Sequence, residues 1–115
     1  MAEFHSFTED SVQILEIAGR IEPDSWKAMK EALDAAASKQ PDGKLLVDLE
    51  KLEYIASSGF RDLFLAGRKL SREGGSLAVC SAQGEVKRVF QLAGFATVYP
   101  IFETRAAGLE HFKTA

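Results

Sequence analysis

The sequence has few of the residues on which covalent or metal chemistry depends. Cys80 is the single cysteine among 115 residues, so this chain can form neither an internal disulfide nor a cysteine-based zinc site. The two histidines, His5 and His111, lie near opposite ends and form no metal-binding motif. Because Cys80 lies in the apolar run 77–80, we expect a small buried residue there.

Long hydrophobic runs and an excess of basic charge are also missing. No stretch approaches the roughly 18 apolar residues of a membrane-spanning helix, and residues 1–5 lack the pattern of a signal peptide. The 14 basic and 17 acidic residues give a formal net charge of -3, which argues against nonspecific nucleic-acid binding. We therefore expect a cytoplasmic protein with no nucleic-acid partner and no membrane insertion.

The length and composition predict one globular domain. A chain of 115 residues, with 46% hydrophobic and 27% charged residues, is long enough to bury a self-sufficient core. No repeat, low-complexity tract or linker divides it. We expect residues 1–115 to form a single domain.

The apolar periodicity predicts alternating strands and helices. Residues 4–8 and 12–17 are expected to form an antiparallel hairpin, followed by a turn at Gly19. Residues 23–25 are typical of a helix start. The buried face of that helix is predicted to carry Trp26, Met29, Leu33 and Ala36 or Ala37. The later elements are predicted as a strand at 44–49, a helix at 58–72, a strand at 76–81, a helix at 84–93, a strand at 97–102 and a helix at 104–113.

The order of these elements predicts an α/β fold. Strands that alternate with helices pair in parallel through right-handed crossovers, and the opening hairpin adds an antiparallel edge. The expected architecture is a mixed sheet of about five strands with about four helices. In the last helix, Thr104 is the expected N-cap, and Leu109 and Phe112 are expected on one buried side.

A pair of serines lies where the helix at 58–72 begins. Ser57 and Ser58 follow the apolar strand at 44–49 and its polar continuation, and they precede Gly59. Serine is common at helix N-caps, where its oxygen accepts hydrogen bonds from free backbone N–H groups. The simplest expectation is that Ser57 or Ser58 caps this helix.

The serine pair lacks the surroundings of a catalytic nucleophile. The Gly-x-Ser-x-Gly elbow is missing around Ser57, and the histidines near the ends of the chain are poor candidates for a base. No glycine-rich loop precedes a helix in the manner of a phosphate-binding loop. We predict no catalytic residue, no cofactor and no metal. The nearby acidic residues are expected to be solvated loop charges: Asp48, Glu50, Glu53 and Asp62.

Four segments together resemble the STAS domain, in particular the anti-sigma factor antagonists. The central one pairs Asp48-Leu49 with the turn 56–60, and it resembles the family's Asp-Ser-Ser-Gly-Leu motif. The others are residues 17–22, 74–80 and 86–95, so the resemblance spans roughly residues 10 to 105 in order. It implies a STAS-like fold. Ser57 matches the family's phosphate acceptor, and Ala56 replaces the acid that usually precedes it.

The resemblance implies a protein-interaction switch. An anti-sigma factor with a GHKL-type serine kinase domain would bind the form with unmodified Ser57, releasing a sigma factor, and would phosphorylate Ser57 with ATP. A serine phosphatase would be a further partner. Phosphate would add about -1.5 to -2 charges at the positive end of a helix. The residues expected at the partner surface are Tyr54, Ile55, Ala56, Ser57, Ser58, Gly59 and Arg61.

The sequence also indicates how residues near this turn divide between surface and core. We expect Tyr54 and Ile55 to be exposed, and Phe60 and Phe64 to face the core. The basic residues of the same helix are expected to form a polar rim: Arg61, Arg68 and Lys69.

Two alternatives remain open on the sequence alone. One is a STAS subunit that docks without phosphorylation on the ATPase of a lipid-transport ABC complex, or on a larger signalling assembly, and Ala56 favours it. The other is a small serine hydrolase that depends on Ser57 or Ser58, for which we expect no turnover.

Overall fold

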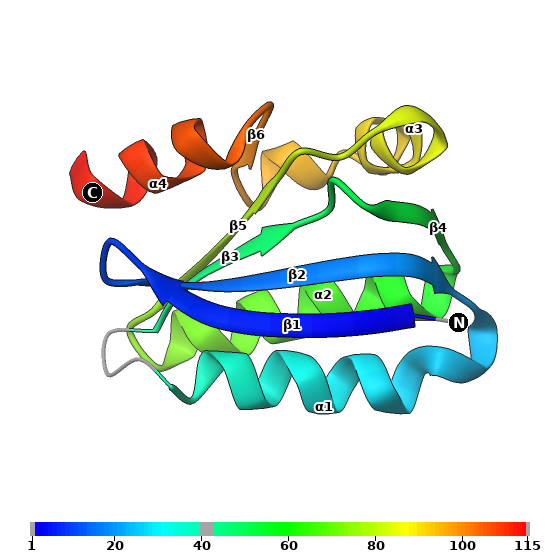
Figure 1. Cartoon of the computed structure of the whole chain (residues 1–115), viewed down its shortest axis with the longest axis horizontal. Coiled ribbons are helices and arrows are strands. Elements are labelled where there is room, and N and C mark those ends of the chain that lie inside the picture. The colour runs from blue at the N-terminus through cyan, green and yellow to red at the C-terminus, as the bar shows by residue number, and fades with distance from the viewer. Residues whose placement is uncertain (1, 40–42, 115) are drawn as a thin grey trace.

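The computed structural model describes residues 2–39 and 43–114. Within these ranges the chain forms six strands and four α-helices (Figure 1). The strands are β1 (Ala2–Glu9), β2 (Val12–Ile21), β3 (Lys44–Asp48), β4 (Leu52–Ile55), β5 (Ser76–Cys80) and β6 (Ile101–Phe102). The helices are α1 (Trp26–Ala37), α2 (Ser57–Arg72), α3 (Gly84–Leu92) and α4 (Arg105–Thr114), with short 3-10 helices at Pro23–Ser25 and Phe95–Thr97.

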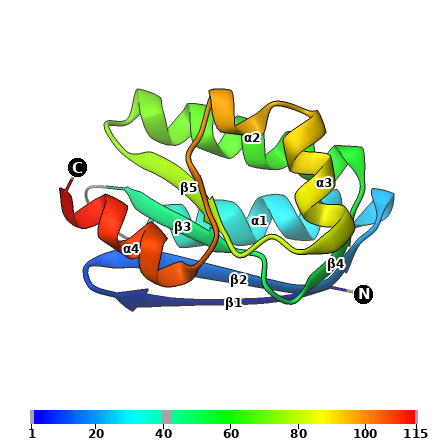
Figure 2. The same cartoon turned by 90° about the horizontal axis from the view of Figure 1, so that it is seen from above.

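The strands form one mixed sheet in the order β1-β2-β3-β5-β6, and β4 pairs with the far end of β2. The β1–β2 hairpin is antiparallel, and all other pairs are parallel. Helices α1 and α2 cover one face of the sheet, while α4 packs on the other (Figures 1 and 2). The predicted α/β fold with an opening hairpin is confirmed.

Both faces of the central strands are buried, which explains why β3 and β5 are continuously apolar. Leu45 and Val47 point toward α1 and α2, whereas Leu46 points toward α4. The smaller core under α4 consists of Val12, Ile14, Leu46, Ala78, Cys80, Leu109 and Phe112. Leu109 and Phe112 therefore lie where the sequence predicted, and Thr104 caps the helix by accepting a hydrogen bond from Ala107 N–H at 3.1 Å.

Cys80 is fully buried in this smaller core, as expected from its apolar neighbours. Burial, together with the nearby Asp48 carboxylate, raises the pKa of the Cys80 thiol to about 12. The thiol is therefore protonated at neutral pH and is a packing group.

The predicted turn at Gly19 is wrong, because β2 continues to Ile21. Gly19 has a φ of +87°, and the pairing register with β4 shifts between Gly19 and Arg20. The extra residue at this shift is Glu53 in β4, because Gly19 pairs with Leu52 and Arg20 pairs with Tyr54. The glycine accommodates the positive φ within the strand, so β2 continues past it.

Two other expectations need correction. The segment after β3 was expected to be a surface loop, but residues Leu52–Ile55 form β4. The strand predicted at 97–102 is shorter, since its first residue belongs to the 3-10 helix Phe95–Thr97 and only Ile101–Phe102 pair with β5. No helix in the described ranges is long and apolar enough to cross a membrane.

Candidate functional site

The serine turn, residues 56–59, is positioned by the parallel pairing of β4 with β2. Ile55 at the end of β4 lies opposite Ile21 at the end of β2. The next residue, Ala56, donates its N–H to the Ile21 carbonyl oxygen at 2.8 Å. The turn therefore sits where the chain leaves β2 toward α1.

Ala56, and not a serine, occupies the N-cap of α2. Its backbone is extended (φ -73°, ψ 158°), and its carbonyl oxygen accepts hydrogen bonds from Gly59 and Phe60 at 3.0 and 3.1 Å. No side-chain hydrogen bond caps this helix. The expected serine cap is wrong, because the helix begins at Ser57 itself, and this leaves Ser57 exposed in the first turn.

Ser58 and Gly59 hold the turn in place. The Ser58 hydroxyl donates to the Pro23 carbonyl oxygen at 3.4 Å. A Cβ on Gly59 would lie 2.4 Å from Cγ2 of Ile21 and 3.2 Å from the Met29 sulfur. Only a hydrogen fits there, so the first turn of α2 lies tightly against β2 and α1.

Tyr54 is exposed, as expected, but Ile55 is not. Tyr54 is 38% exposed, and the Arg20 guanidinium carbon lies 4.5 Å from the centroid of its ring. Ile55 is only 6% exposed, because its pairing with Ile21 turns it into the core. Arg20 was not identified from the sequence, since its contact with Tyr54 depends on the pairing of two distant strands.

Phe60 and Phe64 face the core, as predicted. Phe60 packs against Phe90 and Phe95 at centroid distances of 4.9 and 5.6 Å, and Phe64 packs against Tyr99 at 5.5 Å. The rings lie mostly edge to face. This aromatic cluster joins α2 to α3 and to the 3-10 helix after it. Arg61, Arg68 and Lys69, on the same helix, are exposed.

The four acidic residues near the serine turn do not behave alike. Glu50 and Glu53 are exposed. Asp48 is only 4% exposed, so its expected place among solvated charges is wrong. Its Oδ1 accepts from Glu50 N–H at 3.0 Å, and its Oδ2 accepts from Arg105 Nε at 2.8 Å. Asp62 is partly buried, and desolvation raises the pKa of its carboxyl.

Arg105 is a centre of charge pairing between α4 and the sheet. Besides Asp48, its guanidinium contacts Glu16, and its Nη1 lies 3.6 Å from Glu9 Oε1. Burial acts to lower the pKa of Arg105, but its hydrogen bonds to Asp48 and Glu16 outweigh burial and raise that pKa. This contact leaves no local pattern in the sequence, because Arg105 and Asp48 are 57 residues apart.

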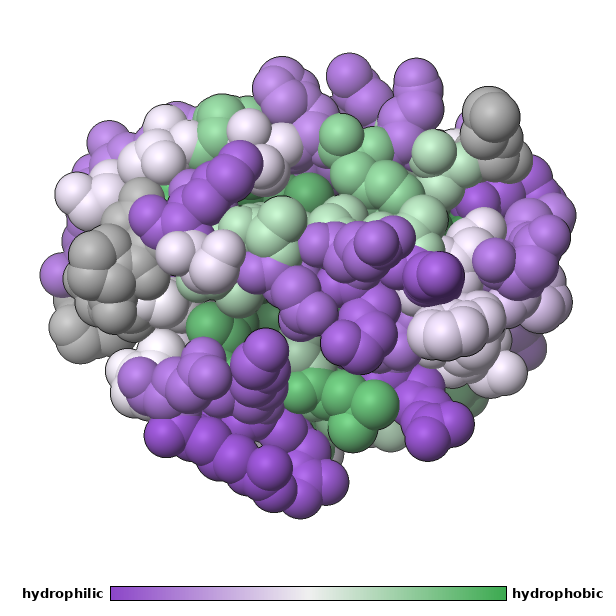
Figure 3. Space-filling model, turned by 90° about the horizontal axis from the view of Figure 1, so that it is seen from below, coloured by the Kyte–Doolittle hydropathy of each residue, from purple (hydrophilic) through white to green (hydrophobic). Residues whose placement is uncertain are grey.

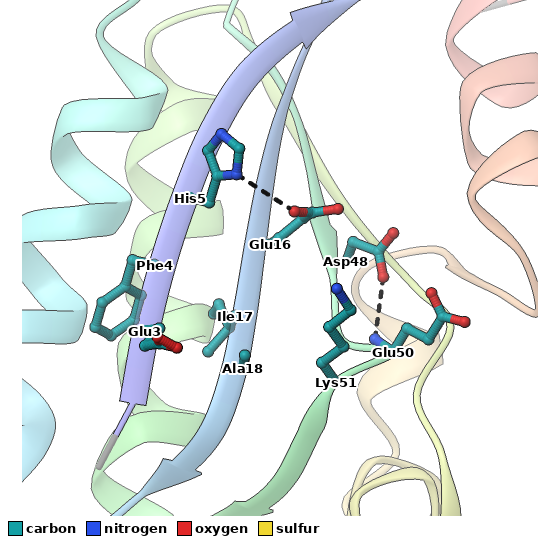
Figure 4. Close-up of a pocket in the computed structure, with 9 residues that line it drawn as sticks. All are labelled: Glu3, Phe4, His5, Glu16, Ile17, Ala18, Asp48, Glu50 and Lys51. Atoms are coloured by element: carbon teal, nitrogen blue, oxygen red, sulfur yellow. Dashed lines mark hydrogen bonds and ion pairs between the residues drawn. The ribbon is translucent and has the colours of Figure 1, made fainter.

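A cavity of about 360 Å³ opens beside these charges (Figure 4). It lies on the same face of the sheet as α4, beyond the part that α4 covers. Glu3, His5 and Glu16 line it from the hairpin, and Lys51 closes it from the loop after β3. His5 Nδ1 lies 3.6 Å from Glu16 Oε1. In the described part of the chain, no three His, Cys, Asp or Glu side chains are grouped so that they could hold a metal ion.

A second cavity, of about 410 Å³, lies between α1 and α2 next to the serine turn. Its lining residues are Trp26, Lys30, Ser58, Arg61, Asp62 and Leu65. Trp26 was expected in the buried stripe of α1, but it is 49% exposed, because the buried face of α1 starts at Met29. Leu65 is 48% exposed, and its exposure was not predicted from the sequence either.

Comparison with known protein families identifies this arrangement. The family model described as Mlab, STAS domain, matches residues 5–103, which include strands β2 to β6, most of β1 and the serine turn. The chain belongs to the STAS domain family. The resemblance carried by the serine turn and the three other segments is thereby confirmed.

Similar STAS proteins are named as anti-sigma factor antagonists. BtrV of Bordetella bronchiseptica, which carries that name, is 34% identical over 91 residues, covering 76% of this chain and 78% of BtrV. The solved anti-sigma factor antagonist of Mycobacterium paratuberculosis is 25% identical, with a TM-score of 0.85 over 96% of this chain and 93% of that one.

A more distant neighbour shares the fold. SpoIIAA, an anti-sigma factor antagonist, has been solved in its unphosphorylated form, and it is 15% identical, with a TM-score of 0.78 over 98% of each chain. The Bacillus protein has also been solved in the phosphorylated form, with a TM-score of 0.70 at 14% identity, over 96% of this chain and 99% of that one.

Proposed function

We propose that residues 1–115 act as a single STAS domain and as a cytoplasmic anti-sigma factor antagonist, controlled by phosphorylation of Ser57. The observation that carries this proposal is the exposed Ser57 in the first turn of α2, on a turn held by Gly59 and Ile21. The likeness to BtrV supports the partner class.

The partner is an anti-sigma factor with a GHKL-type serine kinase domain. It binds the unmodified chain at the surface around Tyr54, Ser57 and Arg61, and a sigma factor is released. The kinase then moves the γ-phosphoryl group of ATP to Ser57 Oγ, so that ADP leaves and the hydroxyl proton passes to a base on the kinase. A serine phosphatase restores the hydroxyl by hydrolysis.

Phosphate on Ser57 would change the surface while leaving the fold intact. The free N–H groups and the positive end of the α2 dipole tolerate negative charge at this position. The turn itself is fixed by backbone and packing contacts that do not involve the Ser57 hydroxyl. A partner lying over the turn would have to desolvate about -1.5 to -2 charges, so binding should fail.

Binding of the anti-sigma factor to Ser57 variants tests this function. The anti-sigma factor that co-purifies with the chain is titrated against wild type, Ser57→Ala and Ser57→Asp. We expect Ser57→Ala to bind like wild type and Ser57→Asp to lose binding. Ser71→Asp, an exposed charge-matched control at the other end of α2, should bind normally. Equal binding by both Ser57 variants would refute the switch.

The second candidate is a STAS subunit that docks without phosphorylation on the ATPase of a lipid-transport ABC complex or on a larger signalling assembly. The observation that favours it is Ala56, a small buried residue where antagonists usually carry an acid. Mass spectrometry of the co-purified complex separates the two. A kinase with a phosphopeptide spanning Ser57 supports the switch, and an ABC ATPase with an unmodified peptide supports the alternative.

A further inference from the structure

Two large apolar side chains are exposed on facing helices beside the serine turn. Trp26 begins α1, and Leu65 lies in the middle of α2. They line the same cavity of about 410 Å³, which we call the Trp26–Leu65 groove and define by Trp26, Lys30, Ser58, Arg61, Asp62 and Leu65. Figure 3 shows the molecule from the side of α1, where apolar surface interrupts the charged side chains.

The fold itself gives no reason for either side chain to be apolar. Met29 and Leu33 supply the contact of α1 with the core, and Leu63 does so for α2. Trp26 and Leu65 remain 49% and 48% exposed after these contacts are made. Grouped exposed apolar side chains mark interaction sites, and tryptophan is enriched among the residues that dominate binding energy.

The groove is continuous with the surface around Ser57. Ser58 belongs both to the serine turn and to the lining of the groove. A partner that covers Ser57 would therefore reach Trp26 and Leu65 without leaving the surface.

Among the residues that line the groove, Arg61 presents an exposed positive charge, and the Asp62 carboxyl is partly enclosed. Lys69 continues the same side of α2 into a neighbouring cavity. Lys30 is held by Asp34 at 3.0 Å, so this pair is neutral overall. Asp62 has one carboxylate oxygen enclosed, without a hydrogen-bond partner among the described residues. An incoming surface with carboxylates would complement this border.

We infer that the Trp26–Leu65 groove binds an apolar side chain of the anti-sigma factor that is flanked by carboxylates. The identity of the partner rests on the proposed function. The groove sets the affinity of the complex through apolar burial, while the state of Ser57 decides whether the complex forms. Arg61 steers the acidic flank of the partner to the groove.

The test compares exposed apolar side chains inside and outside the groove. Trp26→Ala and Leu65→Gln are expected to weaken binding of the co-purified anti-sigma factor by about tenfold or more each. Leu92→Gln is the matched control, because Leu92 is 76% exposed on α3 and lines no part of the groove. It should bind within about twofold of wild type. Circular dichroism and thermal unfolding of each variant confirm that the fold is retained.

Charge is tested separately from apolar contact. Arg61→Glu is expected to slow association and to reduce its dependence on salt, because the acidic flank of the partner would meet a like charge. Arg88→Glu is the control, since Arg88 is exposed on α3. An unchanged association rate for Arg61→Glu would contradict the acidic flank.

The outcomes separate this inference from the proposed function. If Trp26→Ala and Leu65→Gln bind like wild type while Ser57→Asp does not bind, the groove proposal is overturned and the switch stands. If the groove variants abolish self-association of the chain and leave binding of the anti-sigma factor intact, the groove binds a second copy and the proposal is again overturned. If the groove variants weaken binding but Ser57→Asp does not, the groove stands and the switch fails.

Discussion

Arg105 Nε donates to Oδ2 of Asp48 at 2.8 Å, which joins the start of α4 to the end of β3. The other oxygen of Asp48 accepts from the backbone of Glu50, in the loop that leads to β4 and the serine turn. One buried carboxylate thus fixes both the last helix and the entry to the candidate site.

Removing the guanidinium should destabilise the protein strongly. Arg105→Gln leaves the buried Asp48 carboxylate without its charged partner, which costs on the order of 3 kcal/mol. Urea unfolding measures the loss, and hydrogen exchange of α4 amides should rise before global unfolding. Arg88→Gln is the control, because Arg88 is exposed, and it should change the free energy of unfolding by less than about 0.5 kcal/mol. Similar costs for the two variants would show that the Arg105 pairing contributes little.

Asp62 gives a prediction with a defined dependence on pH. Desolvation raises the pKa of Asp62 in the folded chain, so folding disfavours its charged form. The free energy of unfolding therefore falls as the pH rises from the unfolded pKa through the folded pKa, and it stays lower at neutral pH. Asp62→Asn removes this loss, so it should stabilise the chain at pH 7 by less than about 1 kcal/mol, because solvent screens a half-buried group.

The pH dependence distinguishes this effect from a change in packing. The gain from Asp62→Asn should disappear below the unfolded pKa, where the carboxyl is protonated in both states. Unfolding curves at pH 7 and pH 3 measure the difference, and Asp24→Asn, at an exposed carboxylate, serves as the control. A gain of equal size at both pH values would argue against charge as the cause.

Gly59 should tolerate no side chain. In Gly59→Ala, the new methyl group would lie 2.4 Å from Cγ2 of Ile21, so either β2 or the first turn of α2 must shift. Overpacking of this kind costs about 1–3 kcal/mol. Ser58→Ala removes only a 3.4 Å hydrogen bond and should cost less than about 1 kcal/mol. Thermal unfolding compares the two, and an unchanged midpoint for Gly59→Ala would mean that the turn is loosely packed.

The sequence predicted most of the architecture, because most of it is encoded locally. The apolar run before Asp48 and the helical spacing from Phe60 to Leu70 each determine their element within a few neighbouring residues. The strand β4 was missed because only Leu52 and Ile55 of its four residues are buried, which gives no alternating pattern. The continuation of β2 past Gly19 was missed because, in the sequence, a glycine with positive φ inside a strand resembles a glycine in a turn.

The sequence indicated where the candidate serines lie in the chain, but not the contacts around them. Ser57 was singled out by a local motif that resembles the family's, and the structure places it exposed in the first turn of α2. The burial of Asp48 by Arg105, the stacking of Arg20 on Tyr54 and the exposure of Trp26 all depend on which distant elements meet. Such contacts leave no periodic signal in the sequence, so only the folded chain reveals them.

The hydrogen bond from Ala56 to Ile21 also has a consequence for folding order. The serine turn has no side-chain cap of its own, and its geometry comes from a residue 35 positions earlier in the chain. The chain between them must first fold back and bring β4 beside β2, and closing such a loop opposes folding by its entropy. An incompletely folded chain therefore cannot present the turn, so any partner that recognises it also selects for chains that have finished folding.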